Sequence, residues 1–343
     1  MTETERLQQA VGALCSWYRA GHRDLPWRRS PTAYHVWVSE IMLQQTRVQA
    51  VIPYYTRFVR ALPTVQALAE APEEQLMKLW EGLGYYSRAR NLQKAARAIC
   101  RQYGGEVPCT SEQLRALPGI GPYTAGAIAS IAGGEACPAV DGNVLRVLSR
   151  LFARGWDIRA QAVRRQAERE IAAVLPAERP GDCNQAFMEL GATVCLPNGA
   201  PLCAHCPLAA LCLAHAGGTE TAFPVRAPKK QRPIERRTVF LLWKDGRIAL
   251  RKRPNRGLLA GMWEFPNVLE GEDAEQQLGV RLTDLRPLGQ ARHVFTHLEW
   301  HMTGVSARTE DGGTFTWVTP EQLAHDVALP SAFRAYRTVK QQD

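Results

Sequence analysis

The stretch LPGIGPYTAG, residues 117–126, decides the fold of the first half of the chain. Gly119 and Gly121 flank a single isoleucine, and a tyrosine and several small residues follow. Glycines let backbone N–H groups converge without an obstructing side chain, and N–H groups at a helix start favour a phosphate. Because the helix-forming LRAL leads into it, the stretch predicts a phosphate-binding helix–hairpin–helix element; an ordinary tight turn between helices is the alternative.

A single aspartate begins a later predicted helix. In VDGNVLRVLSRLF, residues 140–152, Asp141 precedes apolar residues that recur at helical spacing. Aspartate favours this position because it accepts hydrogen bonds from the first backbone N–H groups, and the helix N-terminus stabilises its charge. A developing positive charge in a reaction also requires a fixed anion. Position alone therefore leaves two roles open for Asp141, a helix cap and a catalytic anion.

The spacing of apolar residues divides the chain into two parts. Residues 1–214 have the periodicity of amphipathic helices, and Thr110 with Gln113 has the pattern of a capping box. One predicted buried face consists of Leu7, Val11, Leu14 and Tyr18. Residues 215–234 are rich in Pro, Lys and Arg and lack any period, which indicates a basic interdomain linker.

The pattern after the linker is that of strands. TVFLLW and IALRKR flank KDGR, which predicts a hairpin with Asp245 and Gly246 at its turn. LEWHMTGV and FTWVT are further candidate strands, and EDAEQQLG is a candidate short helix. Residues 235–343 are therefore expected to form a smaller α+β domain.

Four of the nine cysteines crowd into residues 195–212, CLPNGAPLCAHCPLAALC. The N-terminus resembles no export signal, so a metal site is a better interpretation than a disulfide framework. Four closely spaced thiolates suit an iron–sulfur cluster, whereas structural zinc usually uses two knuckles separated by a longer loop. We expect a 4Fe-4S cluster, with zinc as the alternative, and the ligands would be Cys195, Cys203, Cys206 and Cys212.

The formal net charge of +9 favours a polyanionic partner such as nucleic acid, although a basic soluble protein would have it too. No apolar run is long enough to span a bilayer. We expect a cytoplasmic monomer with no membrane partner, associated with the nucleoid if the source is prokaryotic.

Two of these stretches together resemble a known superfamily. LPGIGPYTAG followed by VDGNV is similar to the helix–hairpin–helix glycosylases of DNA base-excision repair. The resemblance implies that Gly119 and Gly121 let the hairpin bind DNA phosphate and that Asp141 is the catalytic aspartate. In the endonuclease III-like branch, a lysine after the turn attacks the sugar as a Schiff-base nucleophile. Tyr123 stands there in this chain, which implies a glycosylase without an efficient strand-cutting step.

RDLPWRRSPTAYHVWVSEIMLQQTRV, residues 23–48, resembles the adenine DNA glycosylase family in particular. Glu40 lies among apolar neighbours, where an unpaired buried carboxylate is costly, so Glu40 is either solvated or functional. The resemblance implies that Glu40 is the general acid. It also implies residues near the active site or the lesion pair: Arg23, Arg28, Gln44, Gln45 and Thr46.

GLGYYSRARNL, residues 82–92, matches the same family. The resemblance implies that Tyr85 is an aromatic wedge in the base stack, with Arg88 and Arg90 directed toward phosphates. An inserted side chain helps to offset unstacking when a nucleotide is flipped out.

ARHVFTHLEW, residues 291–300, resembles the family's second lesion-reading segment, in a domain that resembles the Nudix fold. Phe295, Thr296 and His297 would contact 8-oxoguanine. A serine is common where Thr296 stands, and threonine keeps the hydroxyl donor. The stretch GLLAGMWEFPNVLEGEDAEQQLGV lacks the acidic run that binds magnesium, so we expect no pyrophosphatase activity.

The expected architecture is a mainly α helix–hairpin–helix glycosylase domain with an iron–sulfur cluster loop, followed by the linker and the Nudix-like α+β domain. The family implies a monofunctional adenine DNA glycosylase that acts in base-excision repair on double-stranded DNA with adenine opposite 8-oxoguanine, and we expect guanine also. Other repair factors are conceivable partners, but no residue identifies one.

In the implied mechanism, protonated Glu40 donates to N7 of a flipped adenine and ionised Asp141 stabilises the cationic sugar. Tyr123 would hold one of these carboxylates, Asn143 would orient Asp141, and water would complete the reaction.

Three other interpretations compete with this one. An endonuclease III-like glycosylase/lyase is opposed by Tyr123. A non-enzymatic DNA-binding module with a redox-sensing cluster leaves Glu40 and Asp141 unexplained. A nucleotide-pool Nudix hydrolase is opposed by the missing acidic run.

Overall fold

The computed structural model describes residues 1–225 and 231–337. They form two compact units, one of residues 1–70 and 91–225 and one of residues 71–90 and 231–337. Residues 71–90 thus belong with the C-terminal part of the chain rather than with the helices on either side of them in sequence. Of the predicted linker, residues 226–230 lie outside the described residues.

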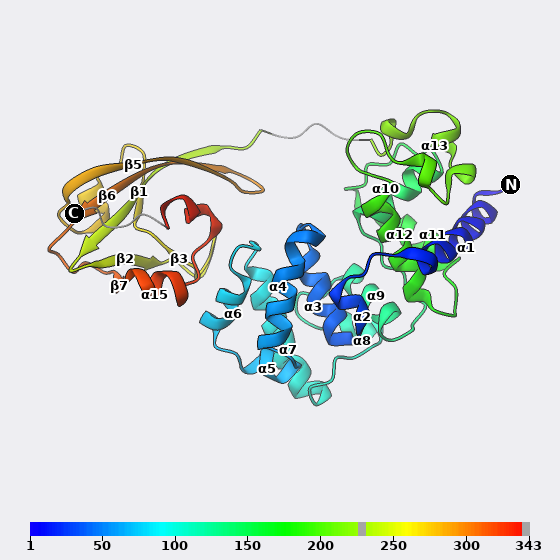
Figure 1. The fold of residues 1–343 in the computed structure, drawn as a ribbon, viewed down its shortest axis with the longest axis horizontal. Helices are drawn as coiled ribbons and strands as arrows, with labels where there is room; N and C mark the ends of the chain where they lie inside the picture. Colours follow the sequence, from blue (N-terminus) through cyan, green and yellow to red (C-terminus); the bar gives the residue numbers. More distant parts are fainter. Residues whose placement is uncertain (226–230, 338–343) are drawn as a thin grey trace. The chain divides into compact units, whose positions relative to one another are not determined.

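The first unit consists of helices, as the sequence predicts for its N-terminal part (Figure 1). They are α1 (Glu3–Gly21), α2 (Pro26–Arg29), α3 (Ala33–Leu43), α4 (Val48–Ala61), α5 (Val65–Glu70), most of α7 (Ser87–Tyr103), α8 (Ser111–Arg115), α9 (Pro122–Ile131), α10 (Gly142–Leu151), α11 (Gln161–Ala172), α12 (Pro180–Thr193), α13 (Leu213–Ala216), and the 3₁₀ helices η1 (Cys203–His205), η2 (Ala209–Leu211) and η3 (Glu220–Ala222). None of the described helices combines the length and the apolar character that crossing a lipid bilayer requires.

The predicted face of α1 is buried in the core of this unit. Leu7, Val11, Leu14 and Tyr18 all pack into one apolar cluster with residues of α10 and α12. Helix α1 begins at a capping box in which the Thr2 side chain accepts from the Glu5 amide and the Glu5 carboxylate accepts from the Thr2 amide. The cap and the apolar face together fix where α10 and α12 lie, and both helices carry site residues.

The predicted hairpin is formed by α8 and α9. The side chain of Thr110 accepts a hydrogen bond from the Gln113 amide, as predicted. A capping box also requires the Gln113 side chain to accept from the backbone amide of Thr110, and this part of the prediction is wrong. The Gln113 side chain accepts instead from the Thr110 hydroxyl, 2.9 Å away.

The small residues of α9 permit a close backbone approach. A Cβ atom on Gly126 would lie 2.1 Å from the carbonyl oxygen of Pro138, so only glycine fits there. The segment that leads to Asp141 therefore lies against the helix that begins at Pro122. This contact brings Tyr123 and Asp141 to the same side of the unit.

The second unit contains α6 (Glu73–Trp80) and a mixed sheet. The sheet order is β3-β2-β1-β6-β5, with β4 paired to β1 and β7 paired to β2. Its strands are β1 (Ile234–Lys244), β2 (Arg247–Lys252), β3 (Trp263–Glu264), β4 (Asn267–Leu269), β5 (Thr283–Val294), β6 (Glu299–Arg308) and β7 (Thr316–Val318), with α14 (Ala274–Leu278), α15 (Pro320–His325) and η4 (Ser331–Tyr336).

The β-hairpin predicted at Asp245 and Gly246 is confirmed. Trp243 pairs with Ile248 and Lys244 with Arg247, and both turn residues have positive φ, 48° and 69°. A turn of this hand matches the twist of the flanking strands. The two candidate strands and the short helix of this domain are also confirmed, as β6, β7 and α14.

Strand β1 is apolar on both faces because both faces of the sheet are covered. Val239, Leu241 and Trp243 pack into one core with residues of α15 and η4. Phe240 and Leu242 pack into the other core, which includes Leu278 of α14. Alternate residues of one strand thus enter opposite cores.

Candidate active site and cysteine-rich loop

A cavity of about 570 Å³ lies in the first unit, a volume that suits a small organic ligand. Helices α3, α9, α10 and α12 contribute to its wall. The site residues that the sequence predicts and the cavity brings together are Arg23, Arg28, Glu40, Gln44, Gln45, Thr46, Tyr123, Asp141 and Asn143. They come from three separate stretches of the chain, so the fold assembles the set.

Glu40 is a buried carboxyl on α3, with only 7% of its surface exposed. The hydroxyl of Tyr123 donates to its Oε2 at 2.6 Å. Burial raises the pKa of Glu40 to about 7, although the Tyr123 hydrogen bond and the charge of Arg28 act to lower it and Asp141 acts to raise it. At neutral pH the carboxyl is therefore poised to donate a proton.

Asp141 is the N-cap of α10. Its Oδ1 accepts from the amides of Asn143 at 2.8 Å and Val144 at 2.9 Å, and its Oδ2 accepts from Asn143 Nδ2 at 2.6 Å. Burial raises the pKa of Asp141, while these hydrogen bonds and the charge of Arg146 oppose the rise. Because Asp141 accepts three hydrogen bonds and Glu40 accepts one, the pair favours charge on Asp141 and the proton on Glu40.

The side chain of Asn143 is held by Arg146. Arg146 donates to Asn143 Oδ1 at 2.9 Å and to the carbonyls of Gly191 and Cys195 at 2.7 and 2.9 Å. With its oxygen taken by Arg146, the Asn143 amide turns its NH₂ group toward Asp141. The buried guanidinium thus orients the residue that orients Asp141.

Glu189 of α12 is a site residue that sequence reasoning missed. Its buried carboxylate accepts from Arg23 at 2.7 and 2.8 Å and from Arg28 at 2.8 Å. Burial acts to raise the pKa of Glu189, but the hydrogen bonds from Arg23 and Arg28 outweigh burial and lower it to about 2. A signal was available, because Glu189 lies among apolar neighbours in FMELGA, as Glu40 does in SEIML.

The hairpin glycines occupy the positions that the sequence indicates. Gly119 has φ +77°, and a Cβ atom on it would lie 2.7 Å from the Cβ of Asn91. Gly121 is the N-cap of α9, and among the described residues no side chain caps the first amides of that helix. The arrangement leaves a helix start of the kind that binds anions.

The second unit has its own cavity, of about 560 Å³. Its wall includes Tyr85, Phe295, Thr296 and His297. Tyr85 is 46% exposed, and its hydroxyl lies 2.8 Å from Oγ1 of Thr296. The segment with the predicted wedge residue, Tyr85, therefore meets the predicted lesion-reading segment within this unit.

In the structure Arg88 and Arg90 have partners within the protein, and the phosphate contacts expected for them stay predictions. Arg88 is buried against the rings of Trp80 and Tyr85, and it donates to the carbonyls of Leu83 and Gly84. Burial lowers the pKa of Arg88 to about 10. Arg90 donates to the carbonyl of Ala260 and pairs with Glu73. Both guanidiniums support the loop that carries Tyr85.

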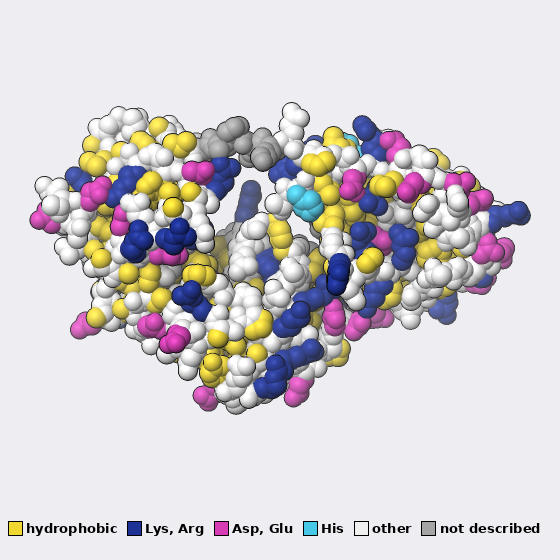
Figure 2. Space-filling model, turned by 180° about the vertical axis from the view of Figure 1, so that it is seen from behind, with side chains coloured by type: hydrophobic (Ala, Val, Ile, Leu, Met, Phe, Trp, Pro, Cys, Tyr) yellow, Lys and Arg dark blue, Asp and Glu magenta, His cyan; other side chains and the backbone are white. Residues whose placement is uncertain are grey.

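Exposed charges of both signs are mixed on the face that Figure 2 shows. Lys and Arg side chains are distributed over the visible face together with Asp and Glu, without one single-sign patch (Figure 2).

The cysteine-rich loop surrounds a small cavity of about 30 Å³, lined by Cys195, Cys203, Cys206 and Cys212. All four are half-buried free thiols. Arg150 donates to Cys195 Sγ at 3.2 Å. Burial raises the pKa of both Cys203 and Cys206 to about 11. Buried thiols of high pKa become thiolates readily only when a cationic group binds them.

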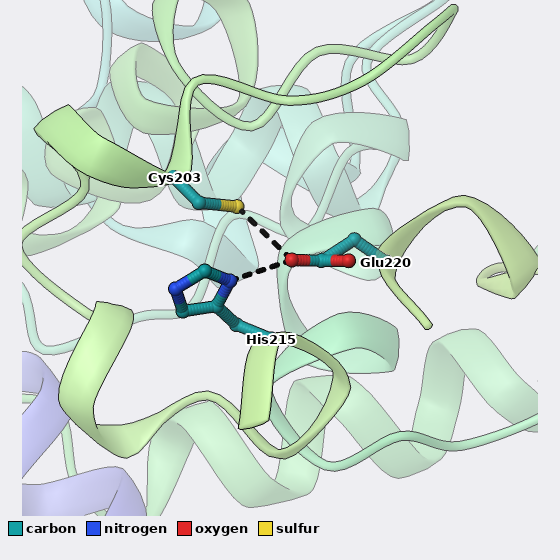
Figure 3. A group of neighbouring side chains, drawn as sticks. All are labelled: Cys203, His215 and Glu220. Atoms are coloured by element: carbon teal, nitrogen blue, oxygen red, sulfur yellow. Dashed lines mark hydrogen bonds and ion pairs between the residues drawn. The ribbon is translucent and has the colours of Figure 1, made fainter. Parts of the chain in front are cut away.

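One tighter group of potential ligand atoms lies at the edge of this loop. The side-chain atoms of Cys203, His215 and Glu220 lie within 4.8 Å of one another. Glu220 Oε1 lies between the other two, 3.6 Å from Cys203 Sγ and 2.6 Å from His215 Nδ1 (Figure 3). The four cysteines line one small cavity together, and four thiols on one short loop are a donor set of the kind that an iron–sulfur cluster takes.

Comparison with known proteins supports the same division of the chain. A family model described as "HhH-GPD superfamily base excision DNA repair protein" matches residues 38–173, and one described as "NUDIX domain" matches residues 238–338. The adenine DNA glycosylase of Homo sapiens is 39% identical over 402 residues, which cover 95% of this chain and 73% of the relative. That of Buchnera aphidicola subsp. Acyrthosiphon pisum is 31% identical over 297 residues, 85% of each.

Solved structures resemble the chain at the level of the fold. A thermostable thymine-DNA glycosylase aligns with a TM-score of 0.56 and 26% identity, covering 62% of this chain and 98% of that one. A trapped endonuclease III–DNA covalent intermediate aligns with a TM-score of 0.55 and 25% identity, covering 64% and 99%. Taken with relatives that match nearly the whole sequence, the two domains show that the chain belongs to the adenine DNA glycosylase family.

Proposed function

We propose that this chain is a monofunctional adenine DNA glycosylase, which hydrolyses the N-glycosidic bond of adenine opposite 8-oxoguanine or guanine in duplex DNA. The observation that carries the proposal is the pair of carboxyls in one cavity, Glu40 with a pKa near 7 and Asp141 held by three hydrogen bonds. Two carboxyls with opposed protonation states divide the work of glycosidic hydrolysis.

The cavity of the first unit would receive the flipped adenine. The Nε of Arg28 is buried and has no hydrogen-bond partner among the described residues. Arg28 lines the cavity, and Glu189 fixes the other edge of its guanidinium. This N–H group is closed off from the cavity, so Arg28 would meet the base through the rest of its side chain, which Glu189 holds in place.

Glu40 would donate its proton to N7 of the bound adenine, which turns the base into a better leaving group. As the bond between C1′ and N9 breaks, positive charge develops on the sugar, and ionised Asp141 stabilises it. A water molecule then adds to C1′ and loses a proton, which leaves an abasic site and free adenine. Asn143 keeps Asp141 oriented throughout.

Tyr123 separates this chain from enzymes that also cut the strand. A phenol has no amine with which to form a Schiff base with the sugar. In this chain the hydroxyl donates to Glu40 instead. Tyr123 would therefore tune the general acid, and the reaction would stop at the abasic site.

The second unit would read the base opposite adenine. Tyr85 has an exposed ring suited to insertion between base steps, and its hydroxyl pairs with Thr296. Phe295, Thr296 and His297 form the turn between β5 and β6, at the rim of the second cavity. Their polar groups would distinguish 8-oxoguanine from guanine.

Cys195, Cys203, Cys206 and Cys212 would hold a 4Fe-4S cluster. When bound, the cluster would supply structural cross-links to the loop and no step of the glycosidic reaction. The loop is joined to the active site through Arg146, which donates to the Cys195 carbonyl. A cysteine-rich loop held in place by the cluster would thus keep Arg146, and through it Asn143, in position.

Cys206→Ser is expected to lower bound iron and acid-labile sulfide and to weaken the visible absorption of the purified protein. Serine supplies a much poorer ligand to iron than a thiolate does. The exposed Cys109 lies outside the loop, so Cys109→Ser is the matched control and should keep both signals. Zinc in place of iron in the wild-type protein would contradict the cluster.

The function is tested by a single-turnover assay on a labelled duplex with adenine opposite 8-oxoguanine, with and without hot alkali. Strand cleavage that appears only after alkali is the expected result, because alkali cleaves at an abasic site. Cleavage without alkali would instead indicate a lyase step. Tight binding with no abasic product would indicate a DNA-binding module without catalysis.

In a plot of excision rate against pH, the rate falls on the alkaline side, along the alkaline limb of the plot. Tyr123→Phe is expected to move this limb to higher pH. The hydroxyl of Tyr123 favours the ionised form of Glu40, so its removal raises the pKa of Glu40 above about 7. The active form is protonated Glu40, which is present below this pKa and lost above it. One hydrogen bond of ~1.4 kcal/mol corresponds to a shift of about one pH unit.

Single-turnover rates measured between pH 5 and about 9 would follow this limb. Tyr103→Phe is the control, because Tyr103 lies at the end of α7, outside the cavity. A limb that stays in place, or one that moves to lower pH, would show that Tyr123 does not act on Glu40.

A further inference from the structure

The loop that carries Tyr85 has a backbone that requires support. Gly82, Gly84 and Tyr85 all have positive φ, at 101°, 69° and 48°. Glycine adopts this region freely, but a bulky residue such as tyrosine does so at a cost of roughly 1 kcal/mol or more. Such a conformation persists only where its surroundings hold it from several sides.

The part of segment 71–90 that directly precedes the loop is held by a network of three charged side chains. The ammonium of Lys78 donates to the carbonyls of Ala324 and Val327 at 2.8 and 3.0 Å, and it pairs with Glu81 at 3.1 Å. Glu81 Oε1 accepts from the amide of Leu329 at 3.0 Å.

The third member of the network is Arg337. Its Nη1 donates to the same Oε1 of Glu81 at 2.5 Å, and its Nη2 donates to the carbonyls of Ala324 and Leu323 at 2.9 and 3.3 Å. Side-chain exposure is 15% for Glu81 and 26% for Lys78 and Arg337, so water screens these charges only in part. Glu81 is the one anion between two cations, and it immediately precedes Gly82.

The other end of the segment is held by Arg90, which donates to the carbonyl of Ala260 at 2.6 Å and pairs with Glu73 at 2.7 Å. Tyr85 therefore lies between two attachment points, both within the second unit. Its hydroxyl meets Thr296 only if the loop keeps its conformation.

We propose that Lys78, Glu81 and Arg337 form a positioning site that fastens segment 71–90 to the C-terminal end of the second unit and thereby holds Tyr85 beside Thr296 before DNA binds. The inference rests on the proposed reading of 8-oxoguanine by this unit. Glu81 is then a specificity-determining residue that touches neither DNA nor adenine. Loss of the Glu81 carboxylate frees the loop. Tyr85 and Thr296 must then be ordered when DNA binds, and this ordering makes the binding free energy less favourable.

The test compares excision of adenine opposite 8-oxoguanine with excision opposite guanine under single turnover at subsaturating enzyme. Glu81→Ala is expected to lower the ratio of the two rates about 5- to 10-fold, within the range for coupled neighbours. Glu81→Gln keeps an acceptor for Leu329 and Arg337 and should recover part of the ratio. Asp284→Asn is the control, because Asp284 forms an exposed ion pair on β5.

Two further measurements separate positioning from general damage. In a chain that carries Thr296→Val, Glu81→Ala should add little further loss, because the contact that it protects is already gone. Hydrogen–deuterium exchange without DNA should rise in Glu81→Ala over residues 82–88 and at the amide of Leu329. Should Glu81→Ala fail to fold, Arg337→Met removes the same contact from the other side.

A wild-type preference for 8-oxoguanine that Glu81→Ala leaves unchanged would overturn the inference. A wild-type chain without that preference would instead overturn the proposed reading of 8-oxoguanine. The hydrogen–deuterium exchange data alone would then test whether Glu81 holds the loop in place. Unchanged exchange over residues 82–88 would refute the positioning site, and increased exchange there would support it.

Discussion

Glu40→Gln is expected to bind lesion-containing duplex as the wild-type chain does and to excise adenine about 10²- to 10⁴-fold more slowly, the range of general acid catalysis. Glutamine has nearly the same size as glutamate, and its carbonyl can still accept the hydrogen bond from Tyr123. The cavity would therefore keep its shape. The change removes the carboxyl whose pKa of about 7 allows it to donate a proton near neutral pH.

The measurement is a single-turnover excision rate at saturating enzyme, with affinity measured separately. Glu70→Gln is the matched control, because it makes the same chemical change at an exposed position of α5. A rate for Glu40→Gln within threefold or so of the wild type would remove Glu40 from the role of general acid. Weak binding with normal excision would make it a binding residue instead.

Glu40→Gln should also change how the stability of the folded chain depends on pH. The pKa of Glu40 is about 7 in the folded chain and 4.5 in the unfolded one, so the unfolded state releases this proton at lower pH. The contribution of Glu40 to the stability of the wild type therefore falls between pH 4.5 and about 7, and Glu40→Gln avoids this loss. Its melting temperature should exceed that of the wild type at pH 8 and equal it near pH 4.

Local signals in the sequence predicted the local structure well. The turn at Asp245 and Gly246 needs only two residues of the right conformational freedom between two apolar runs, and all of these are adjacent. The same holds for the hairpin glycines and for the cap at Asp141. Backbone sterics and short-range hydrogen bonds determine such features, so nearby residues suffice to predict them.

Long-range pairing explains what was missed. Glu189 lies 166 residues from Arg23 in sequence, and no local pattern joins them. Glu81 and Arg337 are 256 residues apart. Residues 71–90 have ordinary helical spacing, so nothing in their own pattern indicates that they group with the C-terminal unit.

Arg88 shows a different limit of prediction from the sequence. A sequence pattern records the charge of an arginine but not the direction of its side chain. Arg88 packs on the rings of Trp80 and Tyr85, and its Nη2 hydrogen-bonds the backbone of the loop, so the guanidinium lies in the interior of the unit. The family resemblance implies a phosphate contact for Arg88, which stays a prediction, and the planar guanidinium also suits the aromatic stack that the structure shows.

Asp141→Asn is expected to slow excision at least about 10³-fold while α10 remains intact. From its position in the sequence, Asp141 could be a helix cap or a catalytic anion. Asp141→Asn separates these two roles. Asparagine caps helices as well as aspartate does, and its oxygen can keep the hydrogen bonds from the amides of Asn143 and Val144. What it lacks is the negative charge that the cationic sugar requires.

The asparagine also changes the contact with the neighbouring amide. Its NH₂ group would face Nδ2 of Asn143, and Asn143 cannot turn over without losing its bond from Arg146. We therefore expect a small loss of stability, about 1 kcal/mol, beside the large loss of rate. Denaturant unfolding gives the first quantity and single-turnover excision gives the second.

Asp157→Asn is the control, because Asp157 is an exposed residue paired with Arg159. Intact mass must be checked before each assay, since an asparagine placed ahead of Gly142 is prone to deamidation back to aspartate. Normal excision by the verified variant would leave Asp141 as a cap only. Equal losses in Asp141→Asn and Asp141→Ala, with α10 intact in the former, would assign the rate to the charge, because only the alanine variant also loses the cap.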